Sequence, residues 1–224
     1  MSTPIIVLIA ITLFLSFILP FVLRRIYYQK LFLNLEQKKI DELNLLLDSI
    51  LCKLLFRPFN REFLRLNGYL INDDSKHIDQ QFHLLINEMQ LNQKQSLSVL
   101  NKAFNYYLSK KDRKHTREVL DELKKNQISK NELKNKEMLY DIIVEKKATY
   151  VNEILKMIEE QLKSSANLSN GAIKYRISVL QYLLGLQYSY LHDTKNTDRY
   201  FNLALEELKG TAFEKEIQSI ISEI

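Results

Sequence analysis

Glycine and proline are scarce in this sequence, with four glycines and three prolines among 224 residues. Hairpins and the tight loops that join strands to helices need Gly, Asn-Gly or Pro at fixed places. Leu, Ile, Lys, Glu, Asn and Gln dominate the sequence instead, and most of these residues are good helix formers. We therefore expect an all-α fold.

Cysteine is nearly absent as well. Cys52, in the apolar run LLLDSILCKLLF, is the one cysteine. No disulfide can form within one chain, and a structural zinc site would need further thiols or a histidine cluster. We expect Cys52 to be a small buried hydrophobic residue.

Motifs of catalysis and of phosphate binding are also missing. The sequence has no G-x-x-x-x-G-K, G-x-G-x-x-G or G-x-S-x-G pattern, and such glycine-rich loops carry phosphate sites and nucleophile elbows. Its four histidines, His77, His83, His115 and His192, are scattered, and no pair has the spacing of a zinc-protease helix. We expect no metal, no other cofactor and no enzymatic activity.

A long apolar run lies near the N-terminus. Residues 4–23 read PIIVLIAITLFLSFILPFVL without a charge, and about 20 apolar helical residues cross a hydrocarbon core of about 30 Å. Met1-Ser2-Thr3 is not basic and no A-x-A site follows the run, which argues against a cleaved signal peptide. We predict an uncleaved transmembrane anchor over residues 1–25.

The flanks of this run predict its orientation. Arg24 and Arg25 follow it and no Lys or Arg precedes it, so the positive-inside rule places the N-terminus outside and residues 24–224 in the cytoplasm. Tyr27 and Tyr28 suit the headgroup zone. Because no Gly or Pro lies between Phe21 and Arg57, we expect the spanning helix to continue into a first repeat helix over 26–36.

An internal repeat follows the anchor. The segments KKIDELNLLL, KHIDQQFHLL and KHTREVLDEL begin at Lys38, Lys76 and Lys114, at a step of 38 residues. Two further sets of positions keep this spacing, namely Glu36, Asp74 and Asp112, and Leu31, Tyr69 and Tyr107. Such a period is typical of helix pairs, which bury their apolar stripes by stacking. Residues 131–164 predict another pair, and 172–191 a long first helix of the last pair.

The last unit resembles a tetratricopeptide (TPR) repeat. Leu184-Gly185, Tyr188, Asp193, Phe201 and Ala204-Leu205 stand at the spacing of that family, whereas Gln181, Thr197 and Lys209 depart from it. The resemblance implies an α-solenoid over 26–224, with about five TPR-like helix pairs and a C-terminal capping helix over 212–224. The repeat-packing positions would be Tyr69, Ile78, Phe82, Tyr107, Thr116, Leu120, Leu184, Gly185, Tyr188, Phe201 and Ala204.

The same comparison decides how we interpret His192-Asp193. The pair falls where Lys111-Asp112 and Asp73-Asp74 fall in earlier units. Asp193, Thr194 and Asn196 have short polar side chains that can bond to free backbone amides at a helix start. We interpret this segment as a turn between two helices and not as a catalytic dyad.

Candidate binding surfaces follow from the resemblance and from charge. In a TPR array the first helix of each pair lines a concave face, which points to Asn67, Asn101, Asn105, Lys174 and Gln181 as contacts for a partner. Residues 110–136 hold ten Lys or Arg against five Asp or Glu. This segment is either an ordinary solvated face or a surface for anionic lipid or an acidic partner. Nucleic acid is not expected, since the basic residues lack interleaved aromatics and a recognised module.

Two functions remain open at this point. The first is a membrane-anchored adaptor or assembly factor that binds a protein partner on the cytoplasmic face without catalysis. The second is a membrane-tethered regulatory module whose groove binds a short peptide or a small ligand. The sequence leaves the partner and the oligomeric state open.

The orientation can be tested by protease accessibility. Protease added to intact cells should leave residues 26–224 undigested, because a cytoplasmic domain is shielded by the bilayer, and should digest them after permeabilisation. Immunoblotting of a C-terminal tag measures both, and digestion in intact cells would show that the orientation is wrong.

Overall fold

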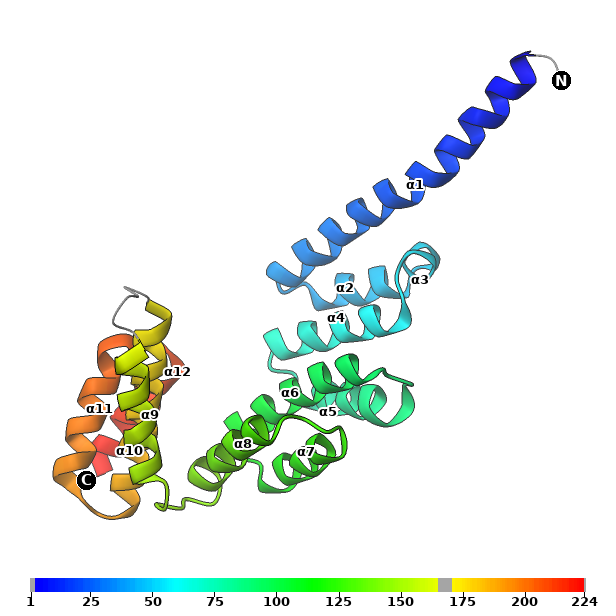
Figure 1. The fold of residues 1–224 in the computed structure, drawn as a ribbon. Helices are drawn as coiled ribbons and strands as arrows, with labels where there is room; N and C mark the ends of the chain where they lie inside the picture. Colours follow the sequence, from blue (N-terminus) through cyan, green and yellow to red (C-terminus); the bar gives the residue numbers. More distant parts are fainter. Residues whose placement is uncertain (1–2, 165–170, 224) are drawn as a thin grey trace. The chain divides into compact units, whose positions relative to one another are not determined.

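Helices make up the described fold (Figure 1). The computed structural model describes residues 3–164 and 171–223, without the side chains of residues 3–15, 17, 164 and 223. Within these ranges there are twelve α-helices, one π-helical turn and no strand, so the expected all-α class is confirmed. The helices are α1 (Thr3–Glu36), α2 (Ile40–Asp48), α3 (Ile50–Leu55), α4 (Pro58–Ile71), α5 (Ser75–His83), η1 (Leu84–Glu88), α6 (Gln93–Ser109), α7 (Arg113–Lys125), α8 (Lys130–Ile143), α9 (Val151–Ser164), α10 (Gly171–Tyr190), α11 (Thr194–Leu208) and α12 (Ala212–Glu223).

The chain divides into two compact units. The N-terminal unit is Met1–Lys102 and the C-terminal unit is Ala103–Ile224. Their boundary lies inside α6. The division predicted at residue 25, between an anchor and a repeat domain, is a separate matter and stays a prediction.

The first helix, α1, extends from Thr3 to Glu36 without a break and contains Pro20. This confirms that the helix carrying the apolar run continues over residues 26–36. Among the residues that the structure describes, no helix is long and apolar enough to cross a membrane. Most of the predicted span, residues 4–15 and 17, lies outside the described side chains, and the anchor stays a prediction.

The core of the N-terminal unit joins the end of α1 to the helices that follow it. Leu31 and Leu35 of α1, Leu43 and Leu47 of α2, Cys52 of α3 and Phe56 form one buried cluster. Cys52 is a free, fully buried thiol, as expected. Burial raises its pKa, so it stays protonated at neutral pH and packs as an apolar group.

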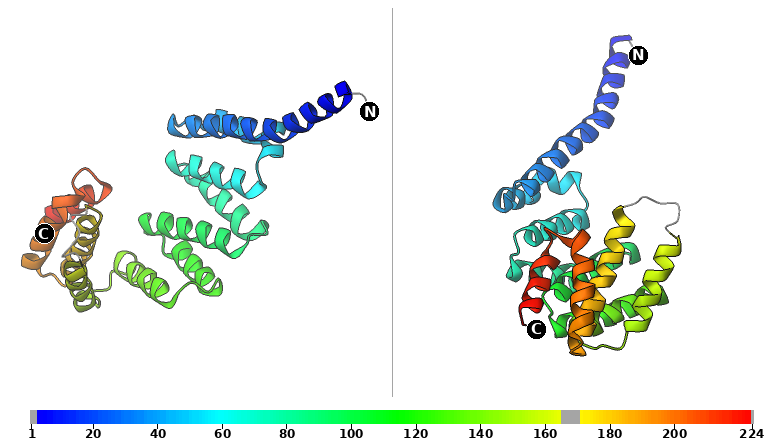
Figure 2. Two further views of the ribbon diagram at one scale, coloured as in Figure 1. Left: turned by 45° about the horizontal axis from the view of Figure 1, so that its top comes forward. Right: turned by 90° about the vertical axis from the view of Figure 1, so that its left-hand side faces the viewer.

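Two close approaches define how the helices of this unit run (Figures 1 and 2). The Arg24 guanidinium of α1 lies 5.6 Å from the ring of Phe56, just before α4 begins. Toward the other end of α4, a Cβ built on Gly68 would lie 3.8 Å from Leu35 of α1 and 2.8 Å from Leu43 of α2. Hence α1 and α4 run in the same direction, and the connection from α2 through α3 to α4 lies at the Arg24 end.

The short helix α3 is an element that the repeat pattern does not predict. Ser49 has an extended backbone, with ψ of 147°, and its side chain accepts a hydrogen bond from the Cys52 N–H at 3.2 Å. This N-cap separates α3 from α2. At the other end, Arg57 precedes Pro58 and is extended, because a residue before proline is disfavoured in helical conformation.

Four helix pairs are closed by the same turn. Lys38, Asp73, Lys111 and His192 have left-handed φ values of 57°, 52°, 54° and 56°. At the third turn, the N–H of Lys111 donates to the Leu108 carbonyl (3.0 Å) and the N–H of Asp112 to the Tyr107 carbonyl (2.9 Å). The other three turns make the same two bonds, which are those of a Schellman motif.

These turns correct the predicted register at its first step. The residue after each left-handed one precedes the second helix, and these residues are Lys39, Asp74, Asp112 and Asp193. The step from Asp74 to Asp112 is 38 residues, as predicted. The predicted alignment places the first unit three residues too early. The residues that match Asp74 and Tyr69 of the second unit are Lys39 and Asn34, and not Glu36 and Leu31. The step from the first unit to the second is therefore 35 residues.

The residues predicted as repeat-packing positions are buried or half-buried. The fourth and eighth residues after each aspartate cap are buried: Ile78 and Phe82, Thr116 and Leu120, and Thr197 and Phe201. Of the remaining positions, Tyr107, Leu184, Gly185 and Ala204 are buried, and Tyr69 and Tyr188 are half-buried.

The C-terminal unit has its own core, in which α10 and α11 are the main packing pair. The predicted pair over 131–164 and the long helix over 172–191 are confirmed as α8, α9 and α10. The helix predicted over 212–224 is present as α12, and its Ile217 is fully buried. An ion pair of 2.8 Å between Lys111 and Glu216 links α12 to the α6–α7 turn.

Gly185 is the tightest point of this core, since a Cβ there would overlap the Phe201 ring. We expect Gly185→Ala to lower the free energy of unfolding by about 1–3 kcal/mol, because the ring must shift in a packed core. Urea unfolding of the full chain measures the loss. Gly171→Ala is the matched control, since nothing lies within 4 Å of a Cβ there.

The cost at Gly185 should fall when Phe201 is shortened. In a Phe201→Leu background, Gly185→Ala should therefore be less destabilising than in the native chain. An equal loss in both backgrounds would show that the ring does not cause it.

Candidate functional site

Two of the repeated turns bring a tyrosine, an aspartate and a histidine together. His115 Nδ1 lies 2.6 Å from Asp112 Oδ2, and the Tyr107 ring stacks on the His115 ring at 4.8 Å. The second copy has the same geometry, with 2.6 Å from His77 to Asp74 and 5.0 Å from Tyr69 to His77. The motif is Tyr-x₄-Asp-x₂-His, and the sequence contains it at 69–77 and 107–115.

The carboxylates of these clusters cap helices. Asp112 accepts the His115 backbone N–H at 3.0 Å, and Asp74 accepts that of His77 at 3.3 Å. Partial burial acts to raise the pKa of Asp112, but the hydrogen bonds from His115 outweigh it and leave the pKa below its ordinary value. The pKa of Asp74 is lowered as well, chiefly by the His77 side chain.

The turn at His192-Asp193 shows which feature it shares with the two Tyr-Asp-His clusters. Asp193 again caps a helix, but Asn196 replaces the histidine and donates to Asp193 at 2.6 Å. Tyr188 stacks on Tyr200 at 5.4 Å. An amide cannot exchange a proton as imidazole does, so what the turns share is a cap. His192 has the left-handed φ of the turn, and the interpretation of this pair as a turn is confirmed.

The five predicted groove residues are divided between the two units, with Asn67 and Asn101 in the N-terminal unit and the other three in the C-terminal unit, and their role in a partner groove stays a prediction. Asn67 lies on α4, Asn101 and Asn105 on α6, and Lys174 and Gln181 on α10. Asn105 and Lys174 are exposed and Gln181 is half-buried. Asn101 Oδ1 is buried without a hydrogen-bond partner among the described residues, so its oxygen is turned inward. Asn67 lines a cavity of the N-terminal unit.

That cavity, called here the α1–α4 cavity, has a volume of about 390 Å³. It combines two arginines and two asparagines with a mainly aromatic and aliphatic wall. Its lining residues are Arg24, Tyr28, Leu31, Phe32, Leu47, Phe56, Asn60, Arg61, Phe63, Leu64 and Asn67. Pockets of this size with a few polar groups on an apolar wall are typical of ligand sites.

Aromatic rings and a cation order the mouth of the α1–α4 cavity. Tyr28 lies 4.6 Å from Phe32 and stacks on Phe56 at 6.5 Å. The Arg24 guanidinium lies over the Phe56 ring, 5.6 Å from its centroid. A cation–π contact of this kind stabilises the position of an exposed arginine by about 0.5–1 kcal/mol.

Arg61 and Arg65, one turn apart on α4, differ in their partners. Arg65 pairs with Asp48 at 2.8 Å and Glu62 at 3.1 Å, and its pKa is raised because these carboxylates outweigh the effect of burial. Arg61 donates from Nη1 to the Leu47 carbonyl at 3.4 Å, and its buried Nε has no partner among the described residues. Buried polar atoms are nearly always paired in proteins, so the Arg61 Nε–H is available to donate to a carboxylate or carbonyl oxygen.

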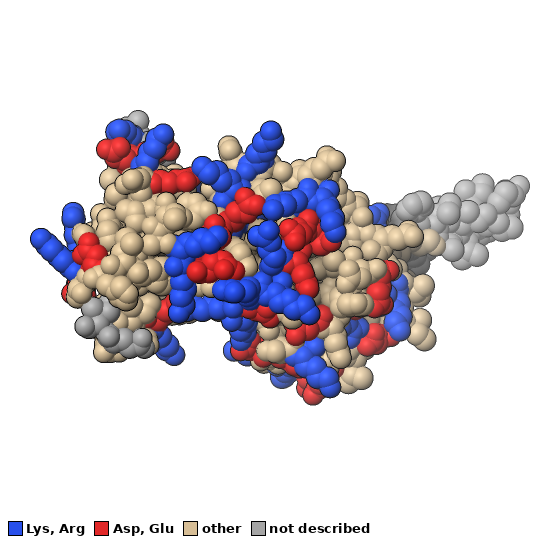
Figure 3. Space-filling model, turned by 90° about the horizontal axis from the view of Figure 1, so that it is seen from below, with Lys and Arg blue, Asp and Glu red and all other residues tan. Residues whose placement is uncertain are grey.

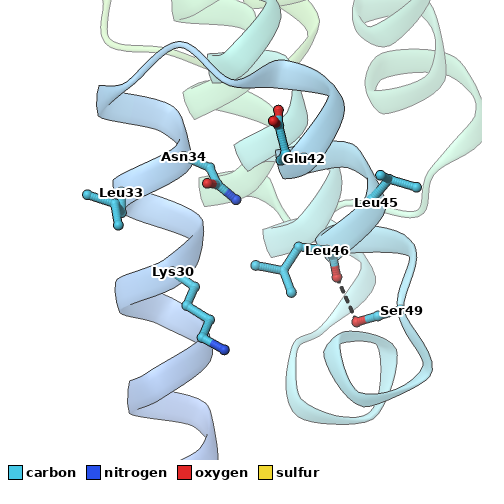
Figure 4. A pocket seen from close by; sticks show the side chains of 7 residues that line it. All are labelled: Lys30, Leu33, Asn34, Glu42, Leu45, Leu46 and Ser49. Carbon is cyan, nitrogen blue, oxygen red and sulfur yellow. Dashed lines mark hydrogen bonds between the residues drawn. The ribbon is translucent and has the colours of Figure 1, made fainter.

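A second depression, of about 440 Å³, lies between α1 and α2 (Figure 4). Figure 4 shows Lys30 and Asn34 on the side of α1 that faces Leu46 of α2, with Leu33 pointing away and Ser49 bonded to the Leu46 carbonyl. Leu33 and Leu45 are half and three-quarters exposed. This depression is open and holds no buried charge, which makes it the weaker candidate.

The basic segment 110–136 is largely neutralised. Lys111, Arg113, Arg117, Lys124, Lys125 and Lys134 each form an ion pair. Figure 3 shows basic and acidic side chains interspersed on the face that it presents. This favours a solvated surface over a patch for anionic partners. Of the residues that the structure describes, no three His, Cys, Asp or Glu could hold a metal.

Comparison with protein-family models, with curated proteins and with solved structures finds no match for this chain. The TPR resemblance therefore rests on the residues of the last unit.

Sequence reasoning missed part of the site. Phe56, Arg61 and Phe63 line the α1–α4 cavity but stand outside the repeat motif. Two signals could have located the chain segment that positions them, namely Ser49 as an N-cap and Pro58 as the first residue of a helix.

The capping role of Asp112 has a pH signature. Asp112→Ala should lower the free energy of unfolding by about 1 kcal/mol, whereas Asp112→Asn should lower it less, because asparagine also caps. A lowered pKa gives stability that is present above the unfolded value, near pH 4, and is lost as the pH falls through the folded value. The difference between native chain and Asp112→Asn should therefore shrink below about pH 4.

Urea midpoints of the full chain, measured at neutral and acidic pH, test this. Glu118→Gln is the control, since Glu118 is exposed on the same helix and caps nothing. A difference that stays constant with pH would contradict the capping role.

Proposed function

We propose that this protein is a membrane-anchored adaptor that binds a protein partner on the cytoplasmic face and performs no catalysis. In this proposal α1/α2, α4/α5, α6/α7, α8/α9 and α10/α11 are the five pairs of a TPR-like solenoid, and α12 is its capping helix. The recurrence of one Schellman turn in four of these pairs supports the solenoid.

The observation that carries the proposal is the continuity of α1. Its last turns, with Leu31 and Leu35, belong to the core of the N-terminal unit. Its apolar run ends at Arg24 and Arg25, whose charges favour the cytoplasmic side. If residues 4–23 span the bilayer, the N-terminal unit is mounted on the spanning helix without a flexible joint.

The partner contacts are best placed in the α1–α4 cavity. Arg24, Arg61 and the rings of Tyr28, Phe56 and Phe63 suit a peptide segment that combines an apolar side chain with a carboxylate. A charged hydrogen bond to such a group would satisfy Arg61. An adaptor needs no reacting group there.

The alternative function is regulatory, with a short peptide or a small ligand in the same cavity. The volume of the cavity favours it, since about 390 Å³ accommodates a small molecule. A ligand of this kind should raise the thermal midpoint of the full chain by mass action, whereas an adaptor should respond only to a protein.

Site-specific photocrosslinking in native membranes tests the adaptor. A photoreactive residue at Asn60, exposed beside the cavity, should yield one protein adduct that mass spectrometry identifies. The adduct should weaken in an Arg61→Glu variant, because a carboxylate would repel an acidic segment. Gln80, exposed on α5, is the control position and should give no such adduct. Equal labelling at both positions would contradict the proposed site.

A further inference from the structure

The outer face of α3 is apolar and uncovered. Ile50 and Leu54 are each 78% exposed and Leu51 is 46% exposed, although Cys52 between them is fully buried. Ile50 and Leu54 stand four residues apart, so they lie on one side of the helix. Exposed apolar groups gathered in this way mark interaction surfaces.

The position of α3 indicates what would cover this face. Phe56, which ends α3, contacts Arg24 at 5.6 Å and Tyr28 at 6.5 Å. Arg24 directly follows the apolar run 4–23, and Phe21, less than one turn earlier, is 71% exposed. Figures 1 and 2 show α3 beside the middle of α1. The apolar face of α3 and the end of the apolar run therefore lie at one level of the molecule.

The charges around α3 fit a surface of anionic lipid. Lys53 and Arg57 are exposed on α3 and directly after it, and Arg24 and Arg25 are exposed on α1. The acidic Asp48 at this end is paired with Arg65. Interfacial helices combine an apolar face in the acyl boundary with long basic side chains at the phosphates.

We propose that α3 is an interfacial membrane helix. Ile50, Leu51 and Leu54 enter the boundary between headgroups and acyl chains of an anionic bilayer, next to the point where α1 leaves it. This rests on the proposed anchoring of α1. A spanning helix alone leaves rotation about its own axis free, and a second contact through α3 fixes which side of the N-terminal unit faces the membrane.

The absence of tryptophan from the sequence provides a direct test. Leu54→Trp introduces the single tryptophan of the full chain, which is reconstituted into vesicles of dibrominated phosphatidylcholine with phosphatidylglycerol. Bromine quenches only tryptophans that lie among the acyl chains. Leu54→Trp should lose most of its emission relative to unbrominated vesicles and should emit at shorter wavelength. Ile50→Trp, on the same face, is a second reporter in case one variant folds poorly.

Two further single-tryptophan variants separate the possible outcomes. Ile71→Trp, 42% exposed at the far end of α4, should not be quenched. Phe21→Trp reports on the anchor and should be strongly quenched. If Phe21→Trp is quenched and neither Leu54→Trp nor Ile50→Trp is, the anchor holds and the proposal for α3 is wrong, which leaves its face to a protein partner. If none is quenched, the anchoring itself fails.

The role of charge is tested in the Leu54→Trp chain. Lys53→Glu combined with Arg57→Glu should reduce the quenching in vesicles that contain phosphatidylglycerol, because repulsion from the anionic surface lifts α3. Unchanged quenching would overturn the part of the proposal that assigns the basic residues to lipid phosphates.

Discussion

A left-handed residue followed by a helix cap is the constraint on which the helix pairs of this protein depend. The residue at φ near 55° reverses the direction of the chain. The backbone N–H of the next residue donates to a carbonyl of the first helix, and the second helix begins directly after it. Each such non-glycine conformation costs about 1–2 kcal/mol. The Schellman bonds offset this cost, together with an aspartate cap at three of the four turns. The turn also fixes where the buried fourth and eighth residues of the second helix meet the first.

The aspartate turns explain why histidine and tyrosine recur beside carboxylates. Asp112 is engaged with the His115 backbone N–H and its ring nitrogen at once, and Tyr107 covers the histidine ring. The three groups therefore hold one another in place at the start of α7. Asn196 serves Asp193 in the same way, which indicates that hydrogen bonding, and not proton transfer, is the property that the position requires.

How much the sequence predicts depends on whether a feature recurs. The all-α class, the pair at 131–164 and the continuity of α1 follow from composition and periodicity. The scarcity of glycine predicts the correct fold class, but it does not mean that left-handed turns are scarce. Six described non-glycine residues take the left-handed conformation. The first repeat step is misread because Lys39 lacks the aspartate that marks the other turns. The α1–α4 cavity could not be predicted, since Arg24, Phe56 and Arg61 come from segments that only the tertiary fold brings together.

The lining of the α1–α4 cavity makes α1 part of the candidate site rather than a simple tether. Arg24, Tyr28, Leu31 and Phe32 come from α1, and Leu31 also belongs to the core. A chain shortened to residues 26–224 would keep α2 to α12 and the last turns of α1 but lose Arg24, and with it the cation over Phe56. A group bound in the cavity contacts the same helix that carries the apolar run. Under the proposed function, binding in the cavity and the position of α1 would be coupled through these shared residues, which a flexibly tethered binding domain would not provide.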